Sequence, residues 1–282
     1  MKLKAFEWLL IVYQLILIVI IAAYRKNITE IDYRYLIALH TICILTIIFF
    51  IPLIKNNFIR LFYPFLILPF FYNEIGLLHH ILYSVPQDAI FMQIDKFIFR
   101  ENIGLTLCRH FPSRIFSEIM HFFYFSYYLV TIVPALYLLK KSISGLERYL
   151  FILLCSFFLF YVIFIFYPVY GPEFYMEYLG KTVSPKKLSG YYFHNILKFI
   201  LSKAERPGAA FPSSHVGISL IVFLIMKNYN KIFSAIIFIC FLGICVSTIY
   251  IRAHYFIDVV AGLLVGYIFY LFIKFIYDKL IG

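Results

Sequence analysis

The chain has 282 residues, of which 63% are hydrophobic and only 14% are charged, and its mean hydropathy is +0.91. Because about a quarter of the residues of an ordinary soluble domain are charged, this composition excludes a soluble globular protein and predicts an all-α, polytopic membrane protein. The formal net charge of +11 suits cytoplasmic loops and anionic lipid headgroups, and we expect no nucleic-acid partner.

Eight segments are apolar enough to cross a membrane, which requires about 20 mostly apolar residues. They are residues 5–24, 35–54, 61–83, 118–139, 149–169, 211–227, 232–251 and 254–274. The first begins like a signal peptide, with Lys2 and Lys4, but its apolar run is too long for one and indicates a span. We expect one integral domain over residues 1–282, with a two-span N-terminal addition over 1–57 and a six-helix core over 58–282.

Two segments between the predicted spans are too polar to cross the membrane. Residues 84–117 carry several charges, and five of their apolar residues recur at helical spacing: Ile90, Phe91, Ile94, Phe97 and Ile98. We expect part of this segment to form an amphipathic helix in the membrane interface. Residues 170–207 contain six basic residues: Lys181, Lys186, Lys187, Lys198, Lys203 and Arg206. We expect this second segment to cover the site and to gather anionic headgroups.

The distribution of basic residues predicts the orientation of the chain in the membrane. Eight spans place both termini on one side, together with the loops at 55–60, 140–148 and 227–231. The basic residues of that side are Lys2, Lys4, Lys55, Arg60, Lys140, Lys141, Arg148, Lys227, Lys231, Lys274 and Lys279, and its acidic residues are Glu7, Glu147 and Asp278. Loops rich in Lys and Arg face the cytoplasm, so we expect cytoplasmic termini and an extracytoplasmic site, whether periplasmic, outer or lumenal.

The first stretch that carries chemistry runs from Arg206 to His215 and reads Arg-Pro-Gly-Ala-Ala-Phe-Pro-Ser-Ser-His. A proline followed by Ser213 and Ser214, just before an apolar run, is typical of a helix start. Free helix amides, the two hydroxyls and Arg206 can converge there on a phosphate group. His215, in the first turn, is close enough to give a proton to a leaving oxygen.

The second stretch places His254 and Asp258 four residues apart at the start of the last predicted span, and therefore on one helix face. Asp258 can accept the Nδ1 proton of His254, which leaves Nε2 free to attack phosphorus. Arg252, two residues earlier, can bind a phosphate bidentately. Because ionisable groups at a membrane edge are usually retained for function, the two stretches together predict a phosphate-handling site at the membrane surface.

The order of these residues resembles the type 2 phosphatidic acid phosphatase (PAP2) superfamily, which shares its core with the vanadium haloperoxidases. The family pattern has three blocks, K-x6-R-P, then P-S-x-H, then S-R-x5-H-x3-D. Arg206-Pro207 matches the end of the first block, residues 212–215 match the second, and His254-x3-Asp258 matches the end of the third.

The resemblance implies a role for each matching residue. His254 would be the nucleophile, His215 the general acid and Asp258 the orienting carboxylate. Arg206, Ser213 and Ser214 would form the phosphate cradle. The family also implies a six-helix core and catalysis without a metal or another cofactor.

Two positions depart from the family pattern. Phe199 stands where the first block has its lysine, and Lys198 and Lys203 are the nearest basic candidates. Thr248 stands where the third block has its arginine, so Arg252 is the candidate for that role. The structural alternatives are an interface anchor for Arg252 and a snorkelling surface role for the two lysines.

The remaining polar residues of the apolar segments are predicted to be structural. Isolated histidines at a membrane interface are more often hydrogen-bonded or solvated than catalytic, and they are His40, His79, His80, His110, His121 and His194. Glu74 lies near His79 and His80, but the spacing lacks the regularity of a known metal site, so we predict no metal.

Two enzymatic functions share all of these residues. The simpler one is a lipid phosphatase that acts on a lipid phosphate or pyrophosphate, with water as the final acceptor. The alternative is a lipid headgroup phosphotransferase, because residues 247–255 and 167–172 are similar to the branch that contains inositol phosphorylceramide synthases and their bacterial relatives. A non-catalytic membrane protein is the remote alternative, which a missing histidine or aspartate would have favoured. The expected partners are the lipid substrate and membrane lipids.

Overall fold

A computed structural model describes residues 2–181, 188–204 and 207–281, except for the side chains of 203 and 204. Within these residues the chain forms twelve α-helices and a short 3₁₀ helix, with no β-strand. Seven helices are long and apolar enough to cross a membrane. They are α1 (Ala5–Ala23), α2 (Tyr33–Phe49) with the following 3₁₀ turn, α3 (Asn57–Leu78), α6 (Arg114–Lys141), α7 (Ile143–Phe166), α11 (Lys231–Tyr250) and α12 (Phe256–Leu280). The chain is therefore an all-α, polytopic membrane protein.

The eighth predicted span, at 211–227, is a shorter apolar helix, α10 (Ser214–Met226). Its 13 residues extend for about 20 Å, against the roughly 30 Å of a bilayer's hydrocarbon core. The irregular segment 207–213, whose residues are buried or half-buried, precedes it. Irregular backbone at membrane depth is tolerated where protein surrounds it, and such a place can hold polar side chains below the membrane surface.

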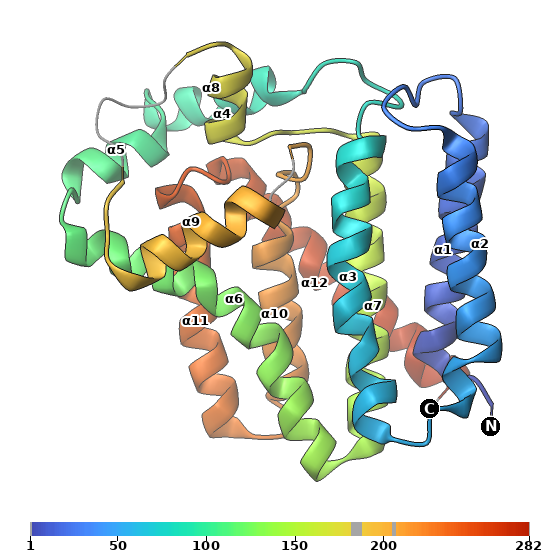
Figure 1. Cartoon of the computed structure of the whole chain (residues 1–282). Helices are drawn as coiled ribbons and strands as arrows, with labels where there is room; N and C mark the ends of the chain where they lie inside the picture. The colour runs from blue at the N-terminus through green and yellow to red at the C-terminus, as the bar shows by residue number, and fades with distance from the viewer. Residues whose placement is uncertain (1, 182–187, 205–206, 282) are drawn as a thin grey trace.

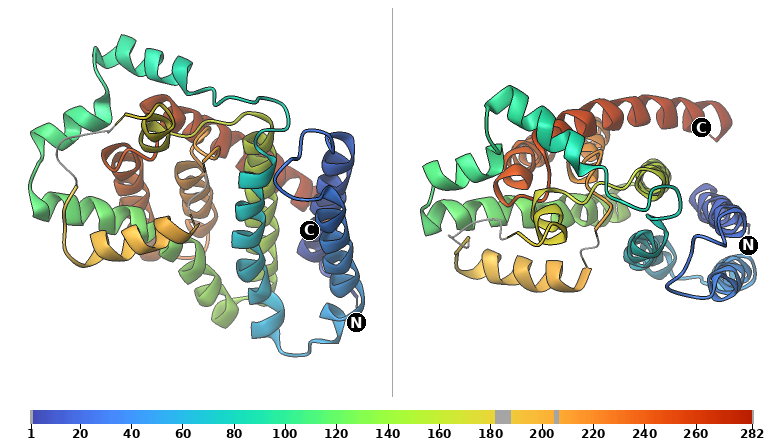
Figure 2. Two further views of the ribbon diagram at one scale, coloured as in Figure 1. Left: turned by 45° about the horizontal axis from the view of Figure 1, so that its top comes forward. Right: turned by 90° about the horizontal axis from the view of Figure 1, so that it is seen from above.

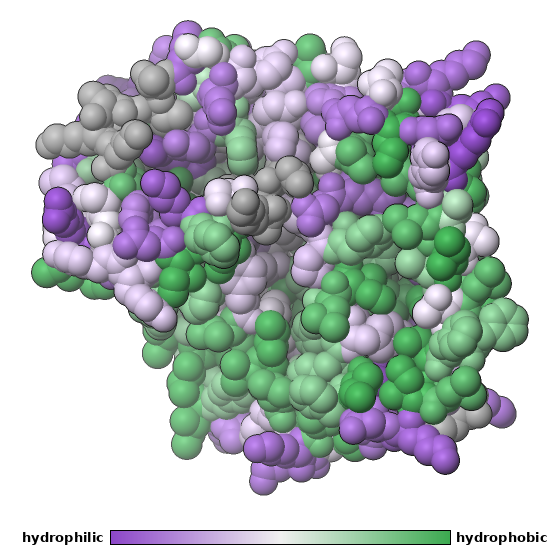
Figure 3. Space-filling view, viewed as in Figure 1, coloured by the Kyte–Doolittle hydropathy of each residue, from purple (hydrophilic) through white to green (hydrophobic). Residues whose placement is uncertain are grey.

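The helices alternate in direction, so the two termini lie at the same end of the bundle (Figure 1). We call this the terminal end. Four shorter helices lie across the opposite end, which we call the capped end: α4 (Asp88–Phe99), α5 (Ile103–His110), α8 (Pro172–Tyr178) and α9 (Tyr192–Ala204). Apolar side chains cover the middle of the bundle and polar ones gather at its two ends (Figure 3), as expected of a protein that spans a bilayer.

The first two helices stand together at one side of the bundle, where α1 packs against α7 (Figure 2). A buried ion pair and a buried hydrogen bond join this helical pair to α3. Glu7 accepts two hydrogen bonds of 2.8 Å from Arg60, and His40 Nε2 lies 2.7 Å from Glu74. The proposed boundary at residue 57 stays a prediction, because the helices on its two sides are in close contact.

The amphipathic helix predicted within 84–117 is α4, but its buried face differs from the expected one. Asp88, Phe91 and Asp95 point into the protein, whereas Phe97 is 89% exposed. The spacing of these three buried residues, i, i+3 and i+7, is one helix face. The acidic residues of α4 are thus part of the folded interior at the capped end.

Helices α10 and α12 cross at glycines, which brings their N-terminal turns together. A Cβ atom on Gly266 would lie 2.6 Å from the Cα of Gly217, and one on Gly262 would lie 2.5 Å from the carbonyl oxygen of Ser213. Neither position has room for a larger residue. The close approach sets the start of α10 beside the start of α12, where Ser213 N–H donates to the carbonyl of Asp258.

Candidate active site

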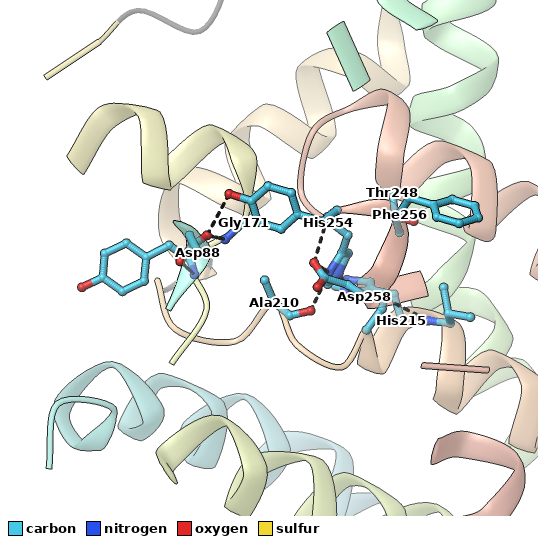
Figure 4. A network of polar contacts seen from close by, with 12 residues as sticks. Asp88, Gly171, Ala210, His215, Thr248, His254, Phe256 and Asp258 are labelled. Atoms are coloured by element: carbon cyan, nitrogen blue, oxygen red, sulfur yellow. Dashed lines mark hydrogen bonds and ion pairs between the residues drawn. The ribbon is translucent and has the colours of Figure 1, made fainter. Parts of the chain in front are cut away.

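The three predicted catalytic residues converge at the capped end of α10, α11 and α12. His215 lies in the first turn of α10 and Asp258 in the first turn of α12, while His254 lies in the turn that joins α11 to α12. Figure 4 shows His215, Asp258 and Ala210 around the ring of His254. The structure therefore brings together residues that are up to 43 positions apart in the chain, from 215 to 258.

The turn that carries His254 is fixed by its backbone. Arg252 adopts a left-handed conformation, with φ of +66°, which ends α11. The N–H groups of Ala253 and His254 then donate to the carbonyl of Thr248, at 3.1 and 3.2 Å. These two bonds satisfy a carbonyl at the helix end and hold the main chain of His254 in place.

The tautomer of His254 follows from a backbone contact. Nδ1 lies 2.8 Å from the carbonyl oxygen of Ala210, which can only accept, so Nδ1 carries the proton and donates. In the neutral ring Nε2 is then bare. It faces Nδ1 of His215 at 3.4 Å, which leaves no room for a phosphorus atom between the rings. A substrate phosphate must therefore move the two histidines apart as it binds.

Asp258 makes a different hydrogen bond from the one expected. The sequence predicts that it accepts the Nδ1 proton of His254, but its Oδ2 lies 3.6 Å from Nδ1, and the carbonyl of Ala210 is the nearer acceptor. Oδ2 instead accepts the N–H of Tyr255 at 2.8 Å, as part of a capping box at the start of α12. The carboxyl group still lies beside the ring, and in its ionised form it can stabilise positive charge on a reacting imidazole.

Burial controls the charge of His254. The residue is 3% exposed, and desolvation by burial lowers its pKa to about 4, although its bond to Ala210 acts in the opposite direction. The ring is therefore neutral near pH 7. A neutral imidazole with a bare Nε2 is the form that can attack an electrophile.

The two serines of the first stretch have different surroundings. Ser213 is the N-cap of α10, and its Oγ accepts the N–H of Val216 at 3.5 Å. Ser214 is buried and lines a cavity together with His215. These two serines stand at the N-terminus of α10, and the N-terminus of a helix is the end that can bind an anion.

Of the basic residues predicted to bind phosphate, only Arg252 and Lys198 have described side chains, and neither lines a cavity at His254. Nε of Arg252 lies 2.8 Å from a carboxylate oxygen of Glu173, and the arginine lines neither of the two cavities at the histidines. Lys198 is exposed on α9. Arg206 and the side chain of Lys203 lie outside the described residues.

Two cavities meet at the histidine pair. The larger one, of about 230 Å³, lies between α3, α6, α7 and α10, with Leu201 of α9 at its edge. On the α10 side the cavity is lined by Ser214 and His215. Its other lining residues are aromatic or aliphatic apart from Thr131. The smaller one, of about 20 Å³, contains both histidines and is lined by residues of the capped end such as Tyr170 and Phe174.

One buried carboxylate next to the site is absent from the sequence-based candidates. Oδ1 and Oδ2 of Asp88 accept the N–H groups of Gly171 and Tyr170 at 2.8 and 2.7 Å, and Oδ1 also accepts the hydroxyl of Tyr255 at 3.1 Å. Desolvation by burial raises the pKa of Asp88 to about 7, while these donors act in the opposite direction. The seven-residue interval between Asp88 and Asp95 could have indicated a common acidic face.

The histidines predicted to be structural have partners elsewhere. Glu74 pairs with His40, whereas Nε2 of His79 and of His80 lie 3.3 and 3.2 Å from the hydroxyl of Tyr170. Glu74 therefore does not join the two neighbouring histidines, as a metal site would require. His121 and His194 form a separate hydrogen bond of 3.1 Å between α6 and α9, and Nδ1 of His110 bonds within α5.

Comparison with known proteins adds to this geometry. A sequence model described as the PAP2 superfamily matches residues 106–272, which is more than half of the chain. A PA-phosphatase related-family protein of Dictyostelium discoideum is 24% identical over 54% of this chain, and the match spans 31% of that relative's length. No solved structure matches the chain. The matched residues contain His215, His254 and Asp258 but not α4.

Proposed function

Because the chain belongs to the PAP2 superfamily, we propose that it is an integral membrane lipid phosphatase that hydrolyses a lipid phosphate or pyrophosphate through a phosphohistidine at His254. Membership itself suggests a phosphatase-like function. The observation that carries the finer proposal is the histidine pair at the end of an apolar cavity, with His254 buried, His215 half-buried, and Nε2 of His254 bare and facing His215.

The proposed reaction has two steps that share one acid–base residue. Nε2 of His254 attacks phosphorus, the bond from phosphorus to the lipid oxygen breaks, and this oxygen takes a proton from protonated His215. Neutral His215 then takes a proton from water, whose oxygen attacks phosphorus. The P–N bond breaks and phosphate leaves. The step requires His215 to be protonated when the substrate binds and His254 to be neutral.

The surrounding groups would stabilise charge in each step. Asp258, 3.6 Å from Nδ1, offsets positive charge on His254 as the P–N bond forms. The amides at the start of α10, with Ser213, Ser214 and Arg206, would bind the phosphate oxygens. We propose Lys198, Lys203 and Arg252 as further cations for the phosphate or its neighbours, and Arg252 would have to release Glu173 to reach it.

The large cavity supports a lipid substrate. It reaches the histidine pair through Ser214 and His215, and its aromatic and aliphatic walls lie within the span region of α3, α6 and α7. An apolar tail in this cavity would place an attached phosphate at His254. A water-soluble phosphate ester would gain nothing from such a cavity.

The small cavity favours water over a bulky acceptor. Its volume of about 20 Å³ suits a single water molecule, which needs at least roughly 10–15 Å³. The alternative, a phosphotransferase similar to inositol phosphorylceramide synthases, needs room for an acceptor hydroxyl and its carrier. In that case α8, which contributes Phe174, would have to move away from His254.

We place the site on the extracytoplasmic face, with both termini in the cytoplasm. The support is the excess of Lys and Arg over acidic residues in the loops of the terminal end. Single cysteines introduced in the α11–α12 turn and at the C-terminus, tested with a membrane-impermeant thiol reagent on intact cells, would check this orientation.

The proposed function is tested with purified protein in detergent and EDTA. Phosphate release is measured from phosphatidic acid, phosphatidylglycerophosphate, sphingosine phosphate, a polyprenyl pyrophosphate and a short water-soluble phosphate ester. We expect release from at least one lipid, loss of release in His254→Ala, and full activity in the control His110→Ala, which removes an exposed histidine of the capped end.

The same assay distinguishes the alternatives. Release that is unchanged in His254→Ala would contradict the phosphohistidine. Transfer of the headgroup phosphate to a ceramide or diacylglycerol acceptor, without release to water, would support the phosphotransferase. Neither activity with any of these lipids would favour a non-catalytic protein.

A further inference from the structure

The segment that holds His254 is bound from outside by a helix that the family match does not include. We infer that Asp88, on α4, is a positioning residue that fixes the tautomer and the position of His254. The inference rests on the proposed function for its catalytic consequence, because only the Nδ1-protonated ring leaves Nε2 free. The contacts that carry it are independent of that function.

One connection from Asp88 to His254 runs through the neighbouring tyrosine. The hydroxyl of Tyr255 donates to Oδ1 of Asp88 at 3.1 Å, and Tyr255 is 1% exposed. Its ring also contacts Phe91 of α4, with a centroid distance of 6.0 Å. Because Tyr255 directly follows His254, a fixed Tyr255 side chain restricts the main chain of the histidine.

A second connection runs through the backbone that accepts the Nδ1 proton. Asp88 accepts the N–H groups of Tyr170 and Gly171, and this fixes the segment that includes Val169. The carbonyl of Val169 accepts the N–H of Ala210 at 2.9 Å. Ala210 in turn accepts the Nδ1 proton of His254. Three successive hydrogen-bonded steps thus lead from one carboxylate to the ring.

The same segment also touches the turn before His254. Gly171 has φ of +85°, and a Cβ atom there would lie 2.3 Å from the carbonyl oxygen of Ala253. Such close approach means that a shift of residues 169–171 would move Ala253 and His254 as well. The loop therefore touches Ala210, which holds the ring of His254, and Ala253, which precedes His254 in the chain.

A second carboxylate of α4 supports the first. Oδ2 of Asp95 accepts the N–H of Phe256 at 3.1 Å, at the start of α12. Asp88 and Asp95 lie on one face of α4, with Phe91 between them. The helix thus contacts residues 255 and 256 at three points along a single face.

A carboxylate is the group that this position requires. Asp88 receives three donors, two backbone N–H groups and one hydroxyl, and no ion pair involves it among the described residues. An asparagine has one acceptor oxygen, and its NH₂ group would face a donor. Asp88→Asn therefore keeps the size of the side chain but cannot accept all three donors, so it loses at least one of the contacts with residues 170, 171 and 255.

The test must distinguish an effect on the position of His254 from a general loss of protein stability. We expect Asp88→Asn to lower kcat about 10- to 100-fold with little change in KM, because outer groups that orient a reacting histidine act on the chemical step. Tyr255→Phe, which removes one donor only, should lower kcat by less. The matched control is Asn102→Ala, which removes the N-cap of α5 at the same end of the molecule and should leave kcat unchanged.

A spectroscopic measurement separates this inference from the proposed function. In protein labelled with ¹⁵N-histidine, the His254 signals, assigned by their loss in His254→Asn, should show protonated Nδ1 and bare Nε2. Tyr255→Phe and Asp88→Asn should show a mixture of tautomers, whether or not a lipid substrate is hydrolysed. If Asp88→Asn does not fold, Tyr255→Phe decides alone. An unchanged tautomer and an unchanged kcat in the folded variants would overturn the inference.

Discussion

The two ends of the bundle use their acidic residues in different ways. At the terminal end acidic side chains pair with cations: Glu7 with Arg60, Glu147 with Lys4 and Asp278 with Arg148. Glu7 is the one of these three that also accepts a backbone N–H, from Lys4 at the start of its own helix. At the capped end Asp88, Asp95, Glu118 and Asp258 accept backbone N–H groups from other segments or from a helix start. The capped end also has ion pairs, Arg252 with Glu173 and Arg109 with Glu101.

This difference reflects which parts of the chain the acidic residues hold in place at each end. An ion pair between side chains joins two helices but leaves the main chain around it free to adjust. A carboxylate that accepts N–H groups restricts the main chain itself, with charge-assisted bonds that are stronger than neutral ones. The capped end contains the loops around His254, and its carboxylates determine the course of those loops. We therefore expect variants at the terminal end to affect stability and variants at the capped end to affect turnover.

The largest effect is expected from the buried ion pair at the terminal end. Arg60 and Glu7 are 3% and 0% exposed, so Arg60→Met leaves a buried carboxylate without its partner. Removing one member of such a pair costs about 3–5 kcal/mol. We expect a large loss of unfolding free energy in detergent, with kcat of the remaining folded protein unchanged.

A double variant shows whether the loss comes from the unpaired charge. Glu7→Leu combined with Arg60→Met removes both charges and should recover most of the stability. If the double variant is as unstable as Arg60→Met, packing rather than charge accounts for the effect. A fall in kcat for either variant would contradict the separation between the two ends.

The second effect tests the crossing of α10 and α12. A Cβ atom on Gly262 would lie 2.5 Å from the carbonyl oxygen of Ser213, so Gly262→Ala must push the start of α10 away from α12. Overpacking of this kind costs about 1–3 kcal/mol. We expect lower thermal stability together with reduced kcat, because Ser213 directly precedes Ser214 and His215. Leu264→Ala, on the exposed side of α12, is the control and should keep full kcat.

The third effect is a dependence of activity on pH. Burial raises the pKa of Asp88 to about 7, so its carboxylate is the main form only above that pH. A protonated carboxyl has its own O–H and cannot accept all three donors at once. We therefore expect kcat to fall as the pH decreases through 7.

The other titratable groups that interact with Asp88 are Tyr170, Tyr175, Tyr255 and Asp258. None of the three tyrosines ionises in this range, because burial raises the pKa of each above its ordinary value.

The matched measurement uses Asp88→Asn with the same substrate, because the substrate phosphate also titrates near neutral pH. The variant should have lower activity overall but lack the part of the acid limb that belongs to Asp88. Linkage gives an independent check. A raised carboxyl pKa means that this group's contribution to stability is present at low pH and is lost as the pH rises from about 4 to about 7. An identical acid limb in both proteins would contradict this role of Asp88.

The sequence predicts the reacting residues better than the groups that hold them. His215, His254 and Asp258 are recognisable because they lie near the starts of two apolar segments, and their chemistry belongs to their side chains. The acceptor of the Nδ1 proton is the carbonyl of Ala210, and a backbone carbonyl 44 residues from His254 has no signature in the sequence. For this reason the sequence predicts a hydrogen bond from His254 to Asp258, whereas the structure shows it with Ala210.

The helices show the same division between local pattern and tertiary contact. Hydropathy predicts the seven long spans, because a bilayer requires a minimum length of apolar chain. Helix α10 is shorter than the predicted span because the chain before it, residues 207–213, is irregular. Hydropathy cannot predict this, because irregular backbone is tolerated there through contacts with the surrounding protein. In α4 the apolar residues indicated a helix at the membrane interface. The burial of Asp88 depends on donors from residues 170, 171 and 255, far away in the chain.

The smallest effect is expected from the exposed ion pair of the terminal end. Arg148 lies 2.6 Å from Asp278, with side chains that are 35% and 46% exposed. Water and salt screen such a pair, so Arg148→Met should cost less than about 1 kcal/mol, and the cost should shrink as salt is added. The loss for Arg60→Met should change little over the same range of salt, because that pair is buried. A large, salt-independent loss for Arg148→Met would mean that the exposed pair, too, holds the terminal end together. The stability of the terminal end would then depend on all of its charge pairs and not mainly on the buried pair of Arg60 and Glu7.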